Sequence, residues 1–140
     1  MLTYFEKKTK KKRLAKRSDV SPNELKVYLP EICLMEPQYG IDNHVADVKL
    51  LLQGTAIANF YGEMTGKMVS THPSPEVGER IKLSCQNCID RRAPLAARAE
   101  ALSRDKAYLR LTALYVPLSE DNNHIDKLFV HVNVERHKRQ

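Results

Sequence analysis

The sequence has no tryptophan, only three cysteines and five glycines, and no long apolar run. A membrane-spanning helix needs roughly 20 consecutive apolar residues, and no stretch here approaches that length. The positively charged N-terminus is not followed by an apolar segment, so we expect no secretory signal. Three cysteines are an odd number and do not suggest a disulfide framework. A reducing cytoplasm is therefore the expected compartment.

Motifs of enzyme chemistry are also missing. The sequence contains no glycine-rich phosphate loop, no G-x-S-x-G nucleophile turn and no H-E-x-x-H zinc motif. The charged cluster Asp90-Arg91-Arg92 stands at the end of a predicted helix, where a solvated helix terminus is the simpler interpretation. We therefore expect a protein that is not an enzyme.

The basic charge is confined to one end of the chain. The 140 residues have a net charge of +6 and are 42% apolar, which suits one domain with a real core. Residues 1–17 carry eight basic side chains and one acid, whereas the remaining 123 residues carry 15 basic and 16 acidic side chains. Only this arm could attract nucleic acid or an anionic surface, and the neutral body argues against such binding elsewhere.

We divide the sequence into three parts: a basic N-terminal helix or arm at 1–20, one globular domain at 21–136 and a basic tail at 137–140. In the arm, residues 2–16 could form a weakly amphipathic helix. A solvated helix is the simplest interpretation, and the alternatives are attraction to an anionic surface or packing across a partner subunit.

The hydrophobic pattern predicts five strands around a helical middle. Strands are expected at 32–35, 47–53, 95–102, 108–118 and 125–134, and one long helix at 76–90. In the last strand, alternation places Leu128, Val130, Val132 and Val134 on one face, and Phe129, His131 and Asn133 on the other. This order predicts an α+β fold, with an antiparallel sheet covered on one face by helices.

The phrase GTAIANFYGEMTG, from Gly54 to Gly66, is the most sharply punctuated part of the sequence. Thr55 is expected to cap a short helix. Its apolar residues Ile57, Phe60 and Tyr61 share one face. Gly62 is expected to end the helix in the left-handed conformation. Such a segment forms either a pocket wall or a packing corner.

This phrase, the long helix and Val116-Pro117-Leu118 resemble a PAS domain. The segments RSDVSPNEL (Arg17–Leu25) and YLPEICLME (Tyr28–Glu36) resemble the entry segment of small bacterial proteins in which the PAS fold makes up nearly the whole chain. The resemblance spans roughly Tyr4 to Glu135, so the domain at 21–136 is PAS-like. It implies a five-stranded antiparallel sheet in the order 2-1-5-4-3, with helices on one face enclosing a small cavity, plus an N-terminal helix.

The resemblance also implies a function. PAS domains act in signal transduction as sensors or interaction modules, with ligands that range from haem and flavin to small acids or none. They commonly form homodimers through an N-terminal helix. We therefore expect a non-enzymatic sensory module, most simply a homodimer, that binds a small ligand or a signalling protein. The alternatives are nucleic-acid or anionic-surface binding through the arm, and a redox protein that uses Cys85 and Cys88.

Two sets of candidate site residues follow from the resemblance. The cavity candidates come from the helices and the last two strands: Phe60, Tyr61, Met64, Met68, Ile81, Cys85, Leu114, Val116, Val130 and Val132. An ordinary filled core is the alternative for these residues, because methionine and aromatic side chains also fill irregular gaps. The dimer or partner candidates are Leu2, Phe5, Phe129 and His131.

Cofactor chemistry finds little support in the sequence. Cys85 and Cys88 form a C-x-x-C late in the long helix, whereas a redox dithiol normally begins at a helix N-terminus. Zinc needs about four ligands, and only Cys33 and scattered histidines are left to complete a site. No histidine lies where haem would need an axial ligand. Residues 59–62, which correspond to the reactive-cysteine region of flavin photoreceptors, contain no cysteine. Core packing of the cysteines is favoured, and the cofactor, if any, stays unidentified.

Overall fold

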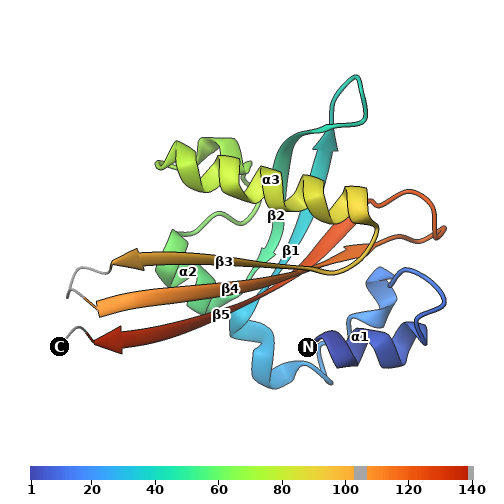
Figure 1. Ribbon diagram of the computed structural model, residues 1–140, viewed down its shortest axis with the longest axis horizontal. Helices are drawn as coiled ribbons and strands as arrows, with labels where there is room; N and C mark the ends of the chain where they lie inside the picture. The colour runs from blue at the N-terminus through green and yellow to red at the C-terminus, as the bar shows by residue number, and fades with distance from the viewer. Residues whose placement is uncertain (103–106, 139–140) are drawn as a thin grey trace.

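The computed structural model describes residues 1–102 and 107–138, which form one twisted sheet with helices on both sides (Figure 1). The sheet is antiparallel, in the order β2-β1-β5-β4-β3. Its strands are β1 Ile32–Tyr39, β2 Val45–Gln53, β3 Leu95–Leu102, β4 Ala107–Leu118 and β5 Lys127–Lys138. The predicted strand order 2-1-5-4-3 is thus confirmed.

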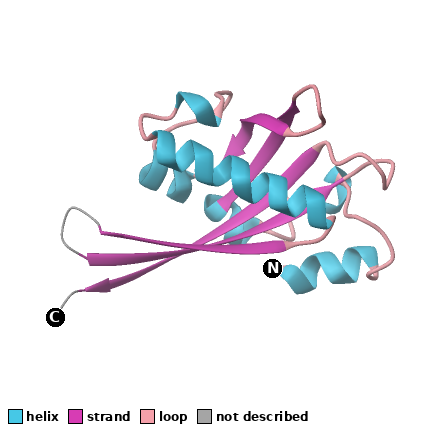
Figure 2. Ribbon diagram, turned by 45° about the horizontal axis from the view of Figure 1, so that its top comes forward, coloured by secondary structure: helices cyan, strands magenta, loops and turns pink. Residues whose placement is uncertain are grey.

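The helices fall into two groups. One group is α2 Thr55–Tyr61, the 3₁₀ turn η3 Val69–Thr71 and α3 Pro75–Arg91, which packs on the inner face of the sheet. The other is α1 Leu2–Thr9 with the 3₁₀ turns η1 Arg17–Asp19 and η2 Lys26–Glu31, at the opposite face (Figure 2). In the part of the chain that the structure describes, no helix is long and apolar enough to span a membrane.

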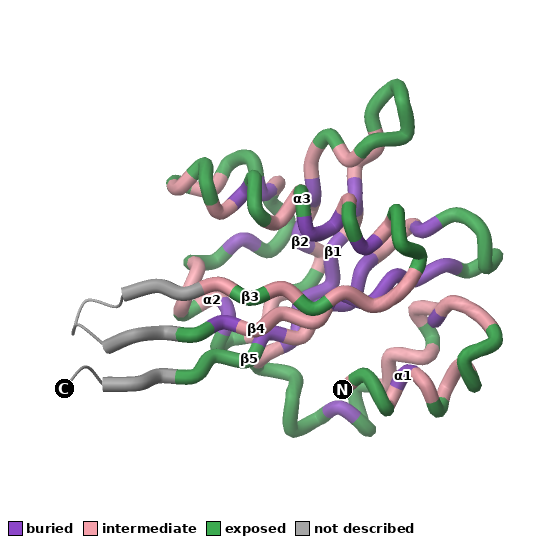
Figure 3. The backbone as a smooth tube through the Cα atoms, viewed as in Figure 1, coloured by how far each residue is buried: buried purple, intermediate pink, exposed green. Residues whose placement is uncertain are grey.

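The sheet is buried on both faces, which gives two cores. The inner core joins α2 and α3 to Leu128, Val130 and Val132 of β5, whereas Phe129 belongs to the outer core. The predicted alternation of β5 is therefore confirmed for these residues. Figure 3 shows the buried segments concentrated where the strands cross between the helices. Val134, which shares the face of Leu128, lies past this cover and is exposed.

The N-terminal segment folds back onto the body instead of projecting as one helix. The helix ends at Thr9, because Lys10 and Lys11 adopt left-handed backbone angles, with φ of 55° and 58°. Clustered lysines repel one another on a helix surface, which disfavours continuation to residue 16. Ala15 then bridges Leu118 of β4, and the Ser119 N–H donates a hydrogen bond to the Ala15 carbonyl at 2.8 Å. The N-terminal arm therefore packs against the rest of the domain.

Strand β1 is longer than predicted because it passes through Pro37. The pairing of β1 with β5 covers only Ile32–Met35, whereas its pairing with β2 continues to Tyr39. Pro37 therefore lies where one side of the strand has no ladder partner, a position that tolerates the missing N–H. At the other end of the sheet, residues 137 and 138 of the expected basic tail continue β5, and residues 139 and 140 lie outside the described residues.

Candidate ligand site between the sheet and α3

Helices α2 and α3 do not fill all the space above the inner face of the sheet. A cavity of about 60 Å³ remains between them. Its walls are mostly apolar, and its polar side chains are Gln53, Tyr61, His72 and Tyr115. Typical small-molecule pockets measure about 300–1,000 Å³. In this conformation the cavity is therefore much smaller than the volume that a flavin or a haem needs.

A second space of about 160 Å³ adjoins this cavity, between α3 and strands β3 and β4. Tyr61, Ile81 and Tyr115 border both spaces. The cleft exists because the strands contribute small side chains there. These small side chains are Ala97, Ala99 and Ala113, all of which pack at the margin of the inner core.

Five of the ten predicted pocket residues line the first cavity: Tyr61, Met64, Ile81, Val130 and Val132. Cys85 is fully buried in the same core without lining the space. Phe60 packs at the margin of the core, and Met68 borders an open surface hollow instead.

The placement of Leu114 and Val116 was wrong. Both lie in the outer core, on the opposite face of the sheet from the cavity. The β4–β5 register pairs Ala113 with Val132 and Tyr115 with Val130, so the inward residues of β4 are odd-numbered. Because β4 is apolar on both faces, its sequence offers no alternation from which this phase can be read.

Three of the four residues that were predicted to contact a partner make contacts within the same chain. Phe5 and Phe129 are buried against each other, with ring centroids 4.8 Å apart. They are therefore core residues, and α1 supplies the cover that a second subunit could have given. His131 is half-buried, with its Nε2 3.3 Å from Oε1 of Glu31. Leu2 is 40% exposed.

Two polar residues that the sequence analysis missed fix the end of α2. The Gln53 side chain accepts a hydrogen bond from the Met64 N–H at 2.7 Å and donates one to the Gly62 carbonyl at 3.0 Å. His72 Nδ1 accepts from the Ser74 N–H at 2.9 Å, so its Nε2 carries the proton and donates to the Tyr61 carbonyl at 2.9 Å. The position of Gln53, at the end of a strand and immediately before a glycine, was the one sequence signal for its role at α2. The sequence around His72 contains no comparable signal.

Both cavity tyrosines are neutral donors at physiological pH. Burial raises the pKa of the Tyr61 hydroxyl, and the positive charge of Arg80 partly offsets this effect. Burial raises the pKa of Tyr115 well above its usual range. A hydrogen bond with Ser84 lowers this pKa, but by less than burial raises it. Arg80 also borders the cleft and was not predicted as a site residue.

The cysteines have the environment of core residues. Cys33, Cys85 and Cys88 are all buried free thiols. Burial raises the pKa of Cys33 and of Cys88 to about 12. The pKa of Cys85 is raised further, mainly by burial and to a smaller extent by the nearby Cys88. A redox dithiol needs an accessible, low-pKa thiolate. Among the described residues, no three of the histidine, cysteine and acidic side chains cluster as a metal site.

Sheet order, helix placement and cavity together define a small α+β domain that encloses a space between its sheet and its helices. A family model described as "PAS domain" matches residues 1–131, so the chain belongs to the PAS domain family. PAS domains generally serve sensing and signalling. A search of curated proteins gives no match.

Two solved structures were found to be similar to this chain. A light-oxygen-voltage domain, studied with a flavin analogue, superimposes with a TM-score of 0.55 at 9% identity, over 81% of this chain and 82% of that chain. A PAS domain from Colwellia psychrerythraea has a TM-score of 0.46 at 12% identity, over 84% of this chain and 97% of that one. At 9% identity, the light-oxygen-voltage domain supports the fold alone.

Proposed function

We propose that this protein is a non-enzymatic PAS sensory module of the cytoplasm, which binds a small ligand and signals to a protein partner as a homodimer. The observation that carries the proposal is the pair of adjoining spaces between the sheet and α3, both bordered by Tyr61. Apolar walls with a few placed polar groups are typical of small-molecule sites. Three free, buried thiols suit a reducing compartment.

Strand β5 offers a route from the cavity to the N-terminal segment. Val130 lines the cavity, and its neighbour Phe129 packs on Phe5 of α1 from the other face of the sheet. A ligand that shifts β5 would therefore alter the packing of α1. Packed interfaces tend to switch between discrete arrangements rather than deform smoothly.

The outer surface beside η2 supports self-association. Its apolar side chains are unusually exposed, led by Val27 at 86% and Leu52 at 52%. Tyr28 and Leu29 extend the same turn and are also exposed. A second copy of the chain is the occupant that would bury this surface symmetrically.

Native mass spectrometry and an absorption spectrum of freshly purified protein test the proposal together. We expect a dimer mass and a retained small molecule that is released on unfolding. A Val27→Glu variant should shift the dimer to monomer, whereas Leu83→Glu, on the exposed side of α3, should not. A ligand-free monomer that also fails to change on incubation with a metabolite extract would contradict the proposal.

Anionic-surface binding is a second candidate, because Lys7, Lys10, Lys11 and Lys12 are all exposed near the end of α1. Removal of residues 1–17 would be a poor test, since it would also strip Phe5 from the core. Because these four lysines are exposed, we expect their change to glutamine to keep the fold. If the arm binds phosphates, the variant should lose affinity for a DNA duplex and show a shallower salt dependence. Equal, weak binding by both proteins would reject this candidate.

A further inference from the structure

Two polar groups at the cleft between α3 and β3–β4 have no partner. They belong to Arg80 and Tyr61, which both border it. Within residues 1–102 and 107–138, neither group makes a hydrogen bond or an ion pair. By contrast, Lys82 of the same helix pairs with Glu79 at 2.7 Å.

Arg98 also borders the cleft, but it lies between Ala97 and Ala99 on β3, so strand alternation directs its exposed side chain toward the opposite face of the sheet. Among the described residues on the helix side of the cleft, Arg80 is therefore the cation without a partner, and Tyr61 adds a free hydroxyl.

The two groups lie close enough to influence each other. The charge of Arg80 lowers the pKa of the Tyr61 hydroxyl, against the larger effect of burial. Arg80 lies one helical turn from Val77 and from Ser84, which also face the cleft. Arg80 therefore lies at the edge of the inward stripe of α3, where its side chain is exposed and still borders the cleft.

The walls of the cleft between these groups are narrow and mostly apolar. Ala97, Ala99 and Ala113 line the sheet side, and the hydroxyl of Tyr115 is already bonded to Ser84. At about 160 Å³, the cleft suits a body of one ring or a short chain. An occupant with a second charge would leave that charge without a partner against these walls, which is costly.

We propose that this cleft binds a small organic monocarboxylate, with the carboxylate on the Arg80 guanidinium and the Tyr61 hydroxyl, and its apolar body against the alanines of β3 and β4. The planar guanidinium matches a carboxylate through two parallel hydrogen bonds. Tyr61 adds a neutral donor from the side. The inference deepens the proposed function, on which it rests, by naming the ligand class.

An NMR titration of the isotope-labelled protein tests this assignment with three probes. Benzoate carries the expected charge and one ring, benzyl alcohol has a similar shape without the charge, and inorganic phosphate has charge without an apolar body. We expect saturable shifts with benzoate at the backbone amides of Ala97, Ala99 and Arg80. The other two probes should bind at least about tenfold more weakly, as the loss of a charged hydrogen-bond pair predicts.

Two variants and one control complete the test. Arg80→Gln should weaken benzoate binding about tenfold or more, and Tyr61→Phe severalfold. Arg91→Gln removes the same charge from an exposed position about 16 Å along α3 and should leave the affinity unchanged. Unchanged spectral dispersion of each variant will show that it is folded.

The outcomes separate this inference from the function on which it rests. Benzyl alcohol binding as tightly as benzoate, with no effect of Arg80→Gln, would overturn the carboxylate assignment and leave a ligand-binding PAS domain. Phosphate binding as tightly as benzoate would also overturn it. If no probe binds, the inference fails, and a retained metabolite in the native mass spectrum would still uphold the proposed function.

Discussion

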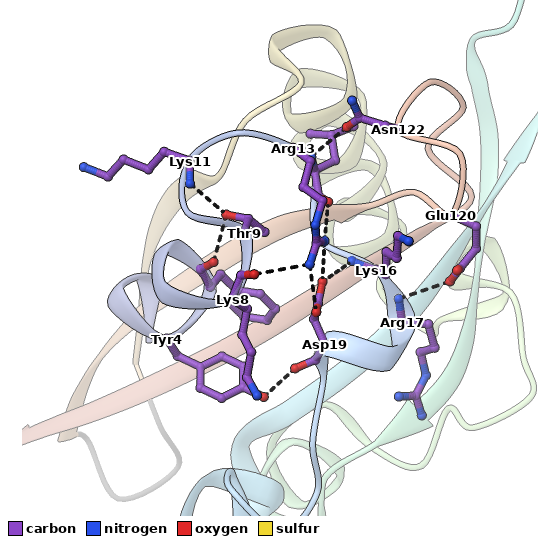
Figure 4. A network of polar contacts seen from close by, with 12 residues as sticks. Tyr4, Lys8, Thr9, Lys11, Arg13, Lys16, Arg17, Asp19, Glu120 and Asn122 are labelled. Atoms are coloured by element: carbon purple, nitrogen blue, oxygen red, sulfur yellow. Dashed lines mark hydrogen bonds and ion pairs between the residues drawn. The ribbon is translucent and has the colours of Figure 1, made fainter.

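Arg13 and Asp19 form a bidentate ion pair: Nη1 lies 2.7 Å from Oδ2, and Nη2 lies 3.2 Å from Oδ1 (Figure 4). The same guanidinium donates to the carbonyls of Lys8 and Leu14. Asp19 also accepts from the Lys16 N–H at 2.8 Å, and its carbonyl accepts from the Tyr4 hydroxyl. These contacts tie α1, the following turn and η1 into one folded unit.

We expect Asp19→Ala to destabilise the protein by about 2 kcal/mol, because it leaves a half-buried guanidinium and several donors without an acceptor. Urea unfolding followed by tyrosine fluorescence or circular dichroism will measure the change. Glu24→Ala is the control, since its pair with Lys8 is largely exposed and such pairs contribute little. If both variants lose the same stability, the Arg13–Asp19 contact has no special role.

The same contact predicts a pH dependence. Hydrogen bonding from Arg13 is the main cause that lowers the pKa of Asp19. A carboxyl with a lowered folded pKa adds stability above its unfolded pKa of about 3.9, and this stability is lost as pH falls through the folded value. The stability gap between the native protein and Asp19→Asn should therefore be full at neutral pH and close below about pH 4. A gap that is constant with pH would show that Asp19 titrates normally.

Phe5 should carry most of the docking energy of α1. Phe5→Ala removes a ring that packs edge-on against Phe129, and we expect a loss of about 3–5 kcal/mol. Leu2→Ala, at a half-exposed position of the same helix, should cost less than about 1 kcal/mol. Thermal unfolding of both variants compares them directly. Similar small losses would mean that α1 docks loosely.

Cys85 and Cys88 should be unreactive in the folded protein. Because burial raises the pKa of both thiols, little thiolate is present near neutral pH, and the sulfurs are also inaccessible. A chromogenic disulfide reagent should therefore react slowly with native protein and with all three thiols at once after unfolding in guanidinium. Rapid reaction of one or two native thiols would revive the redox interpretation.

The sequence predicted the sheet well because its signals there were strong. Clean alternation in β5 and turn residues between strands predicted an antiparallel sheet, and the resemblance to PAS domains supplied the strand order 2-1-5-4-3. Prediction was poorer where both sides of an element are covered. In β4, apolar side chains occupy both phases, with Leu111 and Ala113 on one face and Leu114 and Val116 on the other, so the sequence does not indicate which face is inward. Only the paired register with β5 decides it.

Long-range polar contacts were equally hidden from the sequence. The lysine-rich residues 7–12 were predicted to form a solvated helix, yet the segment turns back because Arg13 pairs with Asp19 and Ala15 bridges Leu118. Nothing in the sequence distinguishes Arg80 from the other charged residues of the amphipathic helix α3. Its place beside Tyr61 depends on how α3 crosses the sheet, which no local pattern specifies.

The phrase that begins at Gly54 supplies the final prediction. Thr55 was expected to cap α2, but Gly54 is the N-cap and Thr55 makes no capping hydrogen bond. The glycine is required for another reason: a Cβ at residue 54 would lie 2.2 Å from the Pro30 carbonyl oxygen, where η2 crosses the start of α2. The Gly54 N–H also donates to the Ile32 carbonyl at 2.8 Å, so this backbone is pinned.

Gly54→Ala should therefore force η2 and α2 apart and cost about 3 kcal/mol or more, since the clash is with backbone that cannot rotate away. Gly40→Ala is a matched control, because its Cβ would meet its nearest neighbours at 3.6 and 3.7 Å, ordinary contact distances. Because α2 carries Tyr61, Gly54→Ala should also shift the amide signals of the cleft residues Ala97 and Ala99, whereas Gly40→Ala should not. Equal stability of the two variants would mean that η2 can move aside without disturbing the candidate site.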